Sequence, residues 1–148
     1  MNFTKRTILT AAMAAGMVYG QTAATTHQSL YDRLGGMPAV QAVVDDLVTR
    51  VLADSRVNKW FAHAASDPAA AAAYKSGLAD FLCQATGGHC KYNGPDLMAA
   101  HKGRGITEEA FQAVVEDLVA TLDKLKVPAQ EKTDLLALLS PIKPAVVQ

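Results

Sequence analysis

The sequence predicts an all-α fold in a single domain. Half of its 148 residues are apolar and only 19% are charged, which provides for one hydrophobic core. Apolar side chains recur every three or four residues in several segments, the period of a helix face. No convincing alternation of apolar and polar residues indicates a strand. Capping residues and glycines divide the apolar segments, so the chain is expected to be a set of separate helices.

A short helix is predicted from Ser29 to Leu34, ending at Gly35-Gly36. A longer helix runs on from Val40, with Asp45-Asp46 as solvated charge on its outer side. Its apolar positions lie on one face, as expected for a helix packed on a core. They are Val43, Val44, Leu47, Val48, Val51 and Leu52.

The next helix is predicted to begin after Asp67, an N-cap residue followed by Pro68 in the first turn, and to stop at Gly87-Gly88. Its apolar stripe comprises Tyr74, Leu78, Phe81, Leu82 and Ala85. A third long helix begins at Thr107, because acidic residues follow this N-cap in the first turn. Its stripe comprises Phe111, Val114, Val115, Leu118, Val119, Leu122 and Leu125.

A last helix is predicted to open at Pro128 and to contain Leu135, Leu136, Leu138, Leu139 and Ile142. Between the second and third long helices lies a segment from Gly87 to Gly105 that is rich in glycine. A loop-rich segment of this length in a small domain is usually functional or disordered, and the composition here favours function.

The first 20 residues have the order of a secretory signal peptide: a basic start, an apolar stretch and a small residue. Cleavage is expected after Gly20, with Ala24 as a second candidate; an amphipathic first helix and an uncleaved anchor are the alternatives. Removal of Lys5 and Arg6 leaves a net charge of 12 − 14 = −2. We expect export, to the periplasm in a bacterium, where disulfides form.

The balanced charge, with 14 basic and 14 acidic residues, argues against an electrostatic nucleic-acid binder. No apolar run reaches the roughly 18 residues of a membrane helix. Cys83 and Cys90 flank a pair of glycines, so the chain can turn back and join them in one disulfide. A zinc site formed by both cysteines with His89 and His101 is an alternative, although the spacing matches no standard zinc pattern.

His101 follows a short apolar turn and precedes Lys102-Gly103-Arg104-Gly105, where it can point into a cavity. Neutral imidazole is the commonest metal ligand and can hold haem iron from one side, whereas the alternative is a surface or helix-capping histidine. Trp60-Phe61 forms either ordinary core or one wall of a pocket for a flat cofactor. Tyr74 faces inward by its period, and a buried tyrosine needs a hydrogen-bond partner.

Several motifs together resemble the first group of truncated haemoglobins. They are Ser29-Leu-Tyr-Asp-Arg-Leu-Gly-Gly36, Val51-Leu-Ala-Asp54 with Trp60-Phe61, the run from Phe81 to Gly88, Tyr92-Asn-Gly94 and His101-Lys-Gly-Arg-Gly-Ile-Thr107. Their order and spacing cover residues 29–146. The resemblance implies a shortened globin fold, a two-over-two helical sandwich around a b-type haem, and we expect a monomer.

The resemblance implies that His101 is the proximal ligand of the haem iron and that Phe61 packs on the haem face. It also implies four further residues along the pocket wall: Tyr92, Leu97, Ile106 and Phe111.

The opposite, distal side departs from the family. The family usually has tyrosine at the position of Val48 and often glutamine at that of Leu78, and these donate hydrogen bonds to bound oxygen. Here Tyr74 either replaces this clamp or no clamp exists. Relatives with a second protein ligand carry histidine or lysine at the position of Gly77, so only His63 and Lys75 remain as internal ligands.

The function implied by the resemblance is binding of oxygen, nitric oxide and carbon monoxide, for oxygen transport or nitric oxide handling. Nitric oxide dioxygenation would need an external reductase, and peroxidase-like turnover would need Tyr74 or His63 as a distal acid–base group. The alternatives are a haem-based electron-transfer protein with an internal distal ligand, a haem-free helical ligand-binding domain, and a structural protein centred on a disulfide or metal.

Overall fold

The computed structural model describes residues 27–148, and this part of the chain contains helices and no strands. The predicted signal peptide and its cleavage site at 20–24 lie outside the described residues. The elements in chain order are α1 (Leu30–Leu34), α2 (Gly36–Ala53), the 3-10 helix η1 (Asn58–Phe61), α3 (Ala62–Ser66), α4 (Pro68–Ala85), α5 (Leu97–His101), α6 (Glu108–Lys124), α7 (Ala129–Ala137) and α8 (Lys143–Val146).

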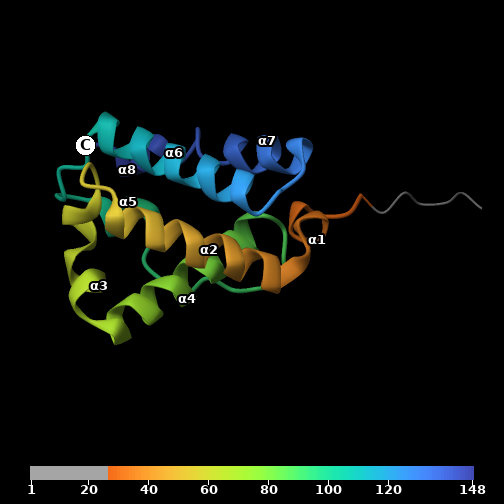
Figure 1. The fold of residues 1–148 in the computed structure, drawn as a ribbon, viewed down its shortest axis with the longest axis horizontal. Coiled ribbons are helices and arrows are strands. Elements are labelled where there is room, and N and C mark those ends of the chain that lie inside the picture. Colours follow the sequence, from red (N-terminus) through yellow and green to blue (C-terminus); the bar gives the residue numbers. More distant parts are fainter. Residues whose placement is uncertain (1–26) are drawn as a thin grey trace, which may run out of the picture.

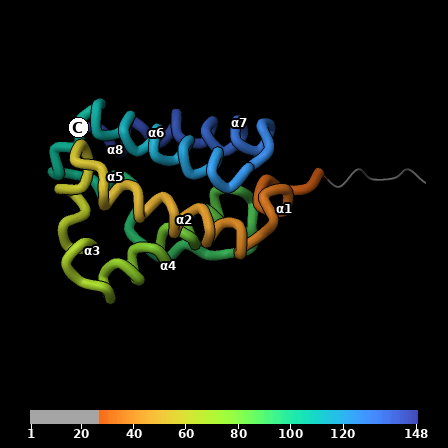
Figure 2. The backbone as a smooth tube through the Cα atoms, in the orientation of Figure 1, coloured from red at the N-terminus to blue at the C-terminus, as the bar shows by residue number. Residues whose placement is uncertain are grey.

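The longer helices form two layers, with α2 and α4 in one and α6 and α7 in the other (Figure 1). Helix α2 contacts both α4 and α6 and so connects the layers. Short elements close the two ends: α1 contacts α7 at one end, and α5 contacts α8 at the other (Figure 2). No helix of the described part is long and apolar enough to cross a membrane.

The predicted helix starts are confirmed by their caps. The Ser29 hydroxyl accepts a hydrogen bond from the amide of Asp32 at the start of α1. The side chains of Asp67 and Thr107 accept in the same way from amides two and three residues later, in α4 and α6. Gly35 ends α1 with φ of 108°, a left-handed conformation that favours glycine.

The apolar face of α2 is buried as predicted, and it is wide enough to contact helices of both layers. Val43, Leu47 and Val51 pack in a cluster with residues of α6 and α7. Val40, Val44 and Val48 pack in a second cluster with Ala79 of α4. Helix α2 is therefore the central element of the core.

The predicted stripe of α4 is partly wrong. Ala85 is exposed and Tyr74 retains 38% of its surface, whereas Ala79 and Cys83 are the buried residues. Small side chains at these two positions let α4 pack closely on α2. The face of α4 that contacts α2 is therefore centred on Ala79 and Cys83, and not on the large residues of the predicted stripe. Leu125 is also 37% exposed, because α6 ends one residue before it.

The prediction of a single last helix is also wrong. Helix α7 ends at Ala137, a turn follows, and α8 begins at Lys143. Pro141 lacks an amide donor and disfavours a helical conformation at Ser140, so the helix is interrupted at this point. The sequence also predicted no helix around Trp60, where η1 and α3 form.

Asp46 joins the two layers through an ion network and is not the solvated charge that the sequence predicted. Its Oδ2 accepts hydrogen bonds from the hydroxyl of Thr121 at 2.9 Å and from Nε of Arg50 at 2.7 Å. Lys124 donates to its other oxygen. These donors, with Lys124 first, lower the pKa of Asp46 from 3.8 to about 2. Its neighbour Asp45 is exposed.

Candidate functional site

His101 is the last residue of α5, a helix that forms because Asp96 caps it by accepting a hydrogen bond from the amide of Ala99 at 2.9 Å. The imidazole is partly buried, and its Nδ1 lies 2.7 Å from the backbone oxygen of Leu97. A carbonyl oxygen only accepts hydrogen bonds, so Nδ1 carries the proton and donates. With Nδ1 engaged in this way, Nε2 is the ring nitrogen left to bind a metal ion, the orientation of a metal-ligating histidine.

Tyr74 and Phe61 are brought together by the structure. Their ring centroids lie 5.5 Å apart in an edge-to-face arrangement. The Tyr74 hydroxyl has no hydrogen-bond partner within residues 27–148. Burial is the main cause that raises its pKa to about 12; Tyr92 also raises it, and Arg104 lowers it. Tyr74 is 38% exposed, and Tyr92 and Arg104 lie close enough to influence its phenol electrostatically.

Tyr92 lies near Tyr74, but its own polar groups are already engaged. Its hydroxyl donates to the backbone oxygen of Pro95 at 3.0 Å, and its amide donates to Oε1 of Gln84 at 2.8 Å. Its ring packs edge-on against Phe81, with the centroids 5.5 Å apart. Since a tyrosine hydroxyl has one proton to donate, Tyr74 is the free phenolic donor among the predicted pocket residues.

The remaining predicted pocket residues are apolar. Leu78 packs against both core clusters, and Ile106 packs against the cluster of α2 and α6. Val48 is only 1% exposed and lies wholly between α2 and α4. Leu97 and Phe111 are half-buried on α5 and α6. Side chains of this composition are suited to contact a flat apolar group.

The residues considered as internal distal ligands lie elsewhere. Nζ of Lys75 is 3.0 Å from Oδ1 of Asp45 on α2, and His63 is exposed on the short helix α3. A Cβ built at Gly77 would meet no atom within 4 Å, so this position of α4 borders open space.

Cys83 and Cys90 are joined in a disulfide, with their Cα atoms 5.8 Å apart. Cys83 is fully buried at the end of α4. The turn passes very close to this bond, because a Cβ at Gly88 would lie 2.5 Å from Sγ of Cys83. The bridged sulfurs offer no thiolate for the zinc site considered from the sequence. In the described residues, no group of three or more His, Cys, Asp or Glu side chains could hold a metal ion.

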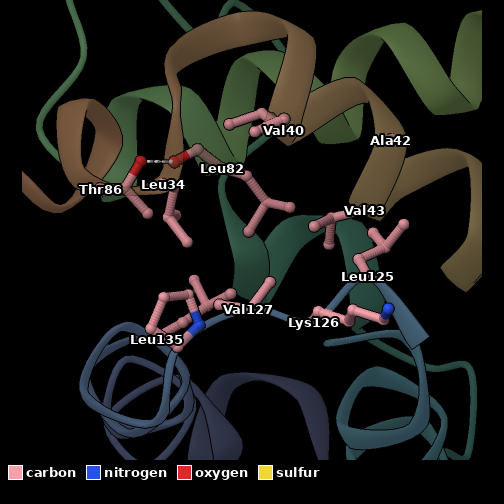
Figure 3. Close-up of a pocket in the computed structure, with 12 residues that line it drawn as sticks. Leu34, Val40, Ala42, Val43, Leu82, Thr86, Leu125, Lys126, Val127 and Leu135 are labelled. Atoms are coloured by element: carbon pink, nitrogen blue, oxygen red, sulfur yellow. Dashed lines mark hydrogen bonds between the residues drawn. The ribbon is translucent and has the colours of Figure 1, made fainter. Parts of the chain in front are cut away.

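A cavity of about 270 Å³ lies between the start of α2, the end of α4 and the turn joining α6 to α7 (Figure 3). These elements meet at the α1 end of the fold, opposite α5 (Figure 1). Leu34, Val43, Leu82 and Leu135 contribute to its apolar lining. The hydroxyl of Thr86 is bonded to the backbone oxygen of Leu82 at 2.7 Å and offers no free donor. The cavity contains no histidine and is separate from the predicted site.

A family model described as bacterial-like globin matches residues 29–148. The chain belongs to this family. A group 1 truncated hemoglobin of Mycolicibacterium paratuberculosis is 31% identical over 118 residues, covering 80% of this chain and 83% of the relative. One of Synechocystis is 41% identical over 104 residues, covering 68% of this chain and 80% of the relative.

Solved structures agree with this assignment. A 2/2 hemoglobin of Synechococcus with covalently attached heme has a TM-score of 0.73 and 32% identity, over 81% of this chain and 98% of that one. The truncated hemoglobin of Tetrahymena pyriformis in its Fe(III) form has a TM-score of 0.73 and 29% identity over the same shares. The predicted two-over-two globin fold is confirmed.

Sequence reasoning missed two contacts in this globin. The indole Nε1 of Trp60 donates to the backbone oxygen of Arg104 at 2.9 Å, three residues after His101. The Gln84 side chain holds the amide of Tyr92 across the disulfide-bonded turn. The Trp60 contact could have been anticipated in part, because a buried indole N–H normally finds a hydrogen-bond acceptor. The sequence does not show which carbonyl group is that acceptor.

Proposed function

We propose that His101 of this globin is the proximal ligand of a haem b iron. Haem with its iron is the cofactor of the family, and haem-based binding of diatomic gases is its function. The observation that carries the proposal is the 2.7 Å contact between Nδ1 of His101 and the Leu97 oxygen, which directs the lone pair of Nε2 away from the helix. One oriented nitrogen suits an iron whose other ligands come from a porphyrin.

The residues around Tyr74 fit such a group. Phe61 supplies aromatic surface, Leu78 and Ile106 supply aliphatic surface, and the Tyr74 phenol has no hydrogen-bond partner within residues 27–148. When bound, the haem supplies an iron with a coordination position for a diatomic gas. The chain's own residues hold that iron from one side, surround the porphyrin with apolar contacts and exclude water.

We infer that Tyr74 is the distal hydrogen-bond donor. It is free to donate, whereas Val48 and Leu78 carry no donor and Tyr92 is engaged with Pro95. Its pKa of about 12 keeps the phenol protonated at neutral pH. A hydrogen bond to a partly charged acceptor contributes roughly 1.5–3 kcal/mol, which favours retention of polar oxygen over less polar carbon monoxide.

We assign the chain to the first group of truncated haemoglobins and propose oxygen transport or nitric oxide handling by a monomer. The similarity to group 1 truncated hemoglobins supports the group. Nitric oxide dioxygenation would require electrons from a separate reductase. The pairing of Lys75 with Asp45 leaves electron transfer through an internal distal ligand without support.

We also propose that residues 1–20 direct export, to the periplasm if the source is bacterial. The disulfide between Cys83 and Cys90 supports this, because structural disulfides persist mainly in oxidising compartments. N-terminal sequencing of the secreted protein should begin near residue 21 or 25. Recovery of an intact first segment in the reducing cytosol would contradict the proposal.

The central experiment is the ultraviolet–visible spectrum of the purified protein in ferric and ferrous states, with and without carbon monoxide. We expect a Soret band, a five-coordinate ferrous form and full conversion by carbon monoxide. A six-coordinate low-spin ferrous spectrum would indicate an internal distal ligand. Absence of a Soret band after haem is offered to the folded protein would refute haem binding.

A further inference from the structure

The segment that follows His101 is held by contacts from distant parts of the chain. We call residues 102–106 the proximal loop. Its Gly103 and Gly105 have φ of 73° and 62°, and a Cβ at either would meet nothing within 4 Å. The loop therefore has little packing of its own at these two points, and its position depends on hydrogen bonds.

The backbone of Arg104 makes two hydrogen bonds that fix the middle of the proximal loop. Its amide donates to the backbone oxygen of His101 at 3.1 Å, and its own oxygen accepts from the indole Nε1 of Trp60 at 2.9 Å. Gln148 makes a hydrogen bond on each side of Arg104. Its side-chain Oε1 accepts from the backbone amide of Gly103 at 2.6 Å, and its backbone amide donates to the backbone oxygen of Ile106 at 3.0 Å. The indole is thus linked to the backbone of His101 through the backbone of a single residue, Arg104.

The position of Trp60 is well defined because η1 is attached to the hydrophobic core. Its amide donates to the oxygen of Val57 at 3.1 Å, and Val57 is 1% exposed in the main cluster. The next residue, Phe61, packs edge-to-face on Tyr74. A phenylalanine at position 60 would fill space in the core, but it would leave the Arg104 carbonyl without this donor.

We propose that Trp60 is a positioning residue for the haem ligand: its indole N–H, by fixing the Arg104 carbonyl, sets the orientation of His101 toward the iron. This inference rests on the proposed function, in which His101 binds haem. The aromatic ring belongs to the core, whereas the Nε1–H acts on the proximal side through the loop.

The test compares Trp60→Phe with Lys59→Met as a matched control. Nζ of Lys59 lies 4.1 Å from the Trp60 ring centroid, so its replacement alters the surroundings of the indole but keeps Nε1–H. The readouts are the iron–histidine stretching band of the ferrous protein in resonance Raman spectra and the rate of haem transfer to excess apomyoglobin.

Trp60→Phe should keep its haem, shift the iron–histidine band and release haem about three- to tenfold faster, the loss expected for one hydrogen bond. Lys59→Met should match the wild type in both readouts. If the iron–histidine band and the haem transfer rate are unchanged in Trp60→Phe, the inference is overturned. This holds even if the melting temperature falls, because a loss of stability alone indicates a purely structural role.

Gln148→Leu provides a second route, because it removes the acceptor for the Gly103 amide from an exposed side chain. If Trp60→Phe does not fold, this variant should still shift the iron–histidine band, and an unchanged band would overturn the inference. Failure of the proposed function looks different: the wild type would bind no haem, or His101→Gly would retain the wild-type band.

Discussion

Replacement of Tyr74 by phenylalanine separates the two roles that this side chain can have. The substitution removes one oxygen atom and keeps the ring that packs on Phe61 with a centroid distance of 5.5 Å. Because the hydroxyl has no partner within the described part of the chain, the folded protein loses no internal hydrogen bond. We therefore expect the free energy of unfolding to change by no more than about 0.5 kcal/mol.

The effect on oxygen should be much larger than the effect on stability. A hydrogen bond to a partly charged acceptor contributes roughly 1.5–3 kcal/mol, so oxygen should dissociate about 10- to 150-fold faster from Tyr74→Phe. Carbon monoxide, which is less polar when bound, should be affected less. Since burial raises the pKa of Tyr74 from 10.0 to about 12, the wild-type rate should show no tyrosine titration up to about pH 10.

Stopped-flow measurement of oxygen dissociation, with carbon monoxide association measured in parallel, checks this prediction. Tyr31→Phe is the matched control, because it makes the same chemical change in α1, at the other end of the fold. Equal oxygen dissociation rates for Tyr74→Phe and the wild type would refute the reasoning. The distal pocket would then be functionally apolar, because the phenol would not reach the ligand.

Three further predictions follow from the other contacts. His101→Gly should lose most of its haem, and free imidazole should restore binding, whereas His63→Ala should keep haem; a Soret band of normal intensity in His101→Gly without imidazole would refute the ligand assignment. Replacement of Cys83 and Cys90 by serine should lower the free energy of unfolding by about 2.5 kcal/mol for this short loop, measured in urea, and should leave the Soret band unchanged; a shifted band would place the bridge closer to the haem than proposed. Asp46 has a folded pKa of about 2 against 3.8, so its stabilisation is complete above pH 3.8 and is lost as pH falls toward 2. After allowance for exposed partners this amounts to about 1–2 kcal/mol, and Asp46→Asn should remove that part of the acid sensitivity; an unchanged acid transition would contradict it.

Much of the fold was predictable because its determinants are local. Ser29, Asp67 and Thr107 each satisfy an amide two or three residues away, and these caps set where helices begin. The apolar face of α2 follows from a period within one helix. The break between α7 and α8 was also visible in the sequence, at Pro141, and was missed because the run of leucines was given more weight than the proline.

The candidate site was predicted only in part. His101 stands out by its position between a short helix and a glycine-rich loop, and its bond to Leu97 spans four residues. The free phenol of Tyr74 could not be recognised in this way. It depends on Tyr92 being engaged with Pro95 and on which groups from other segments, Arg104 among them, lie near the Tyr74 phenol.

The sequence alone determined most of the helices and their caps, and it singled out His101 as the candidate iron ligand, since each depends on neighbours within a few positions along the chain. Only the tertiary structure decided which face of α4 meets α2, why Asp46 is a link between layers, and where the indole of Trp60 finds its acceptor. Those contacts join residues 75 and 44 positions apart for Asp46 and Trp60. Their partners are fixed by the packing of whole helices, and no local pattern encodes that packing.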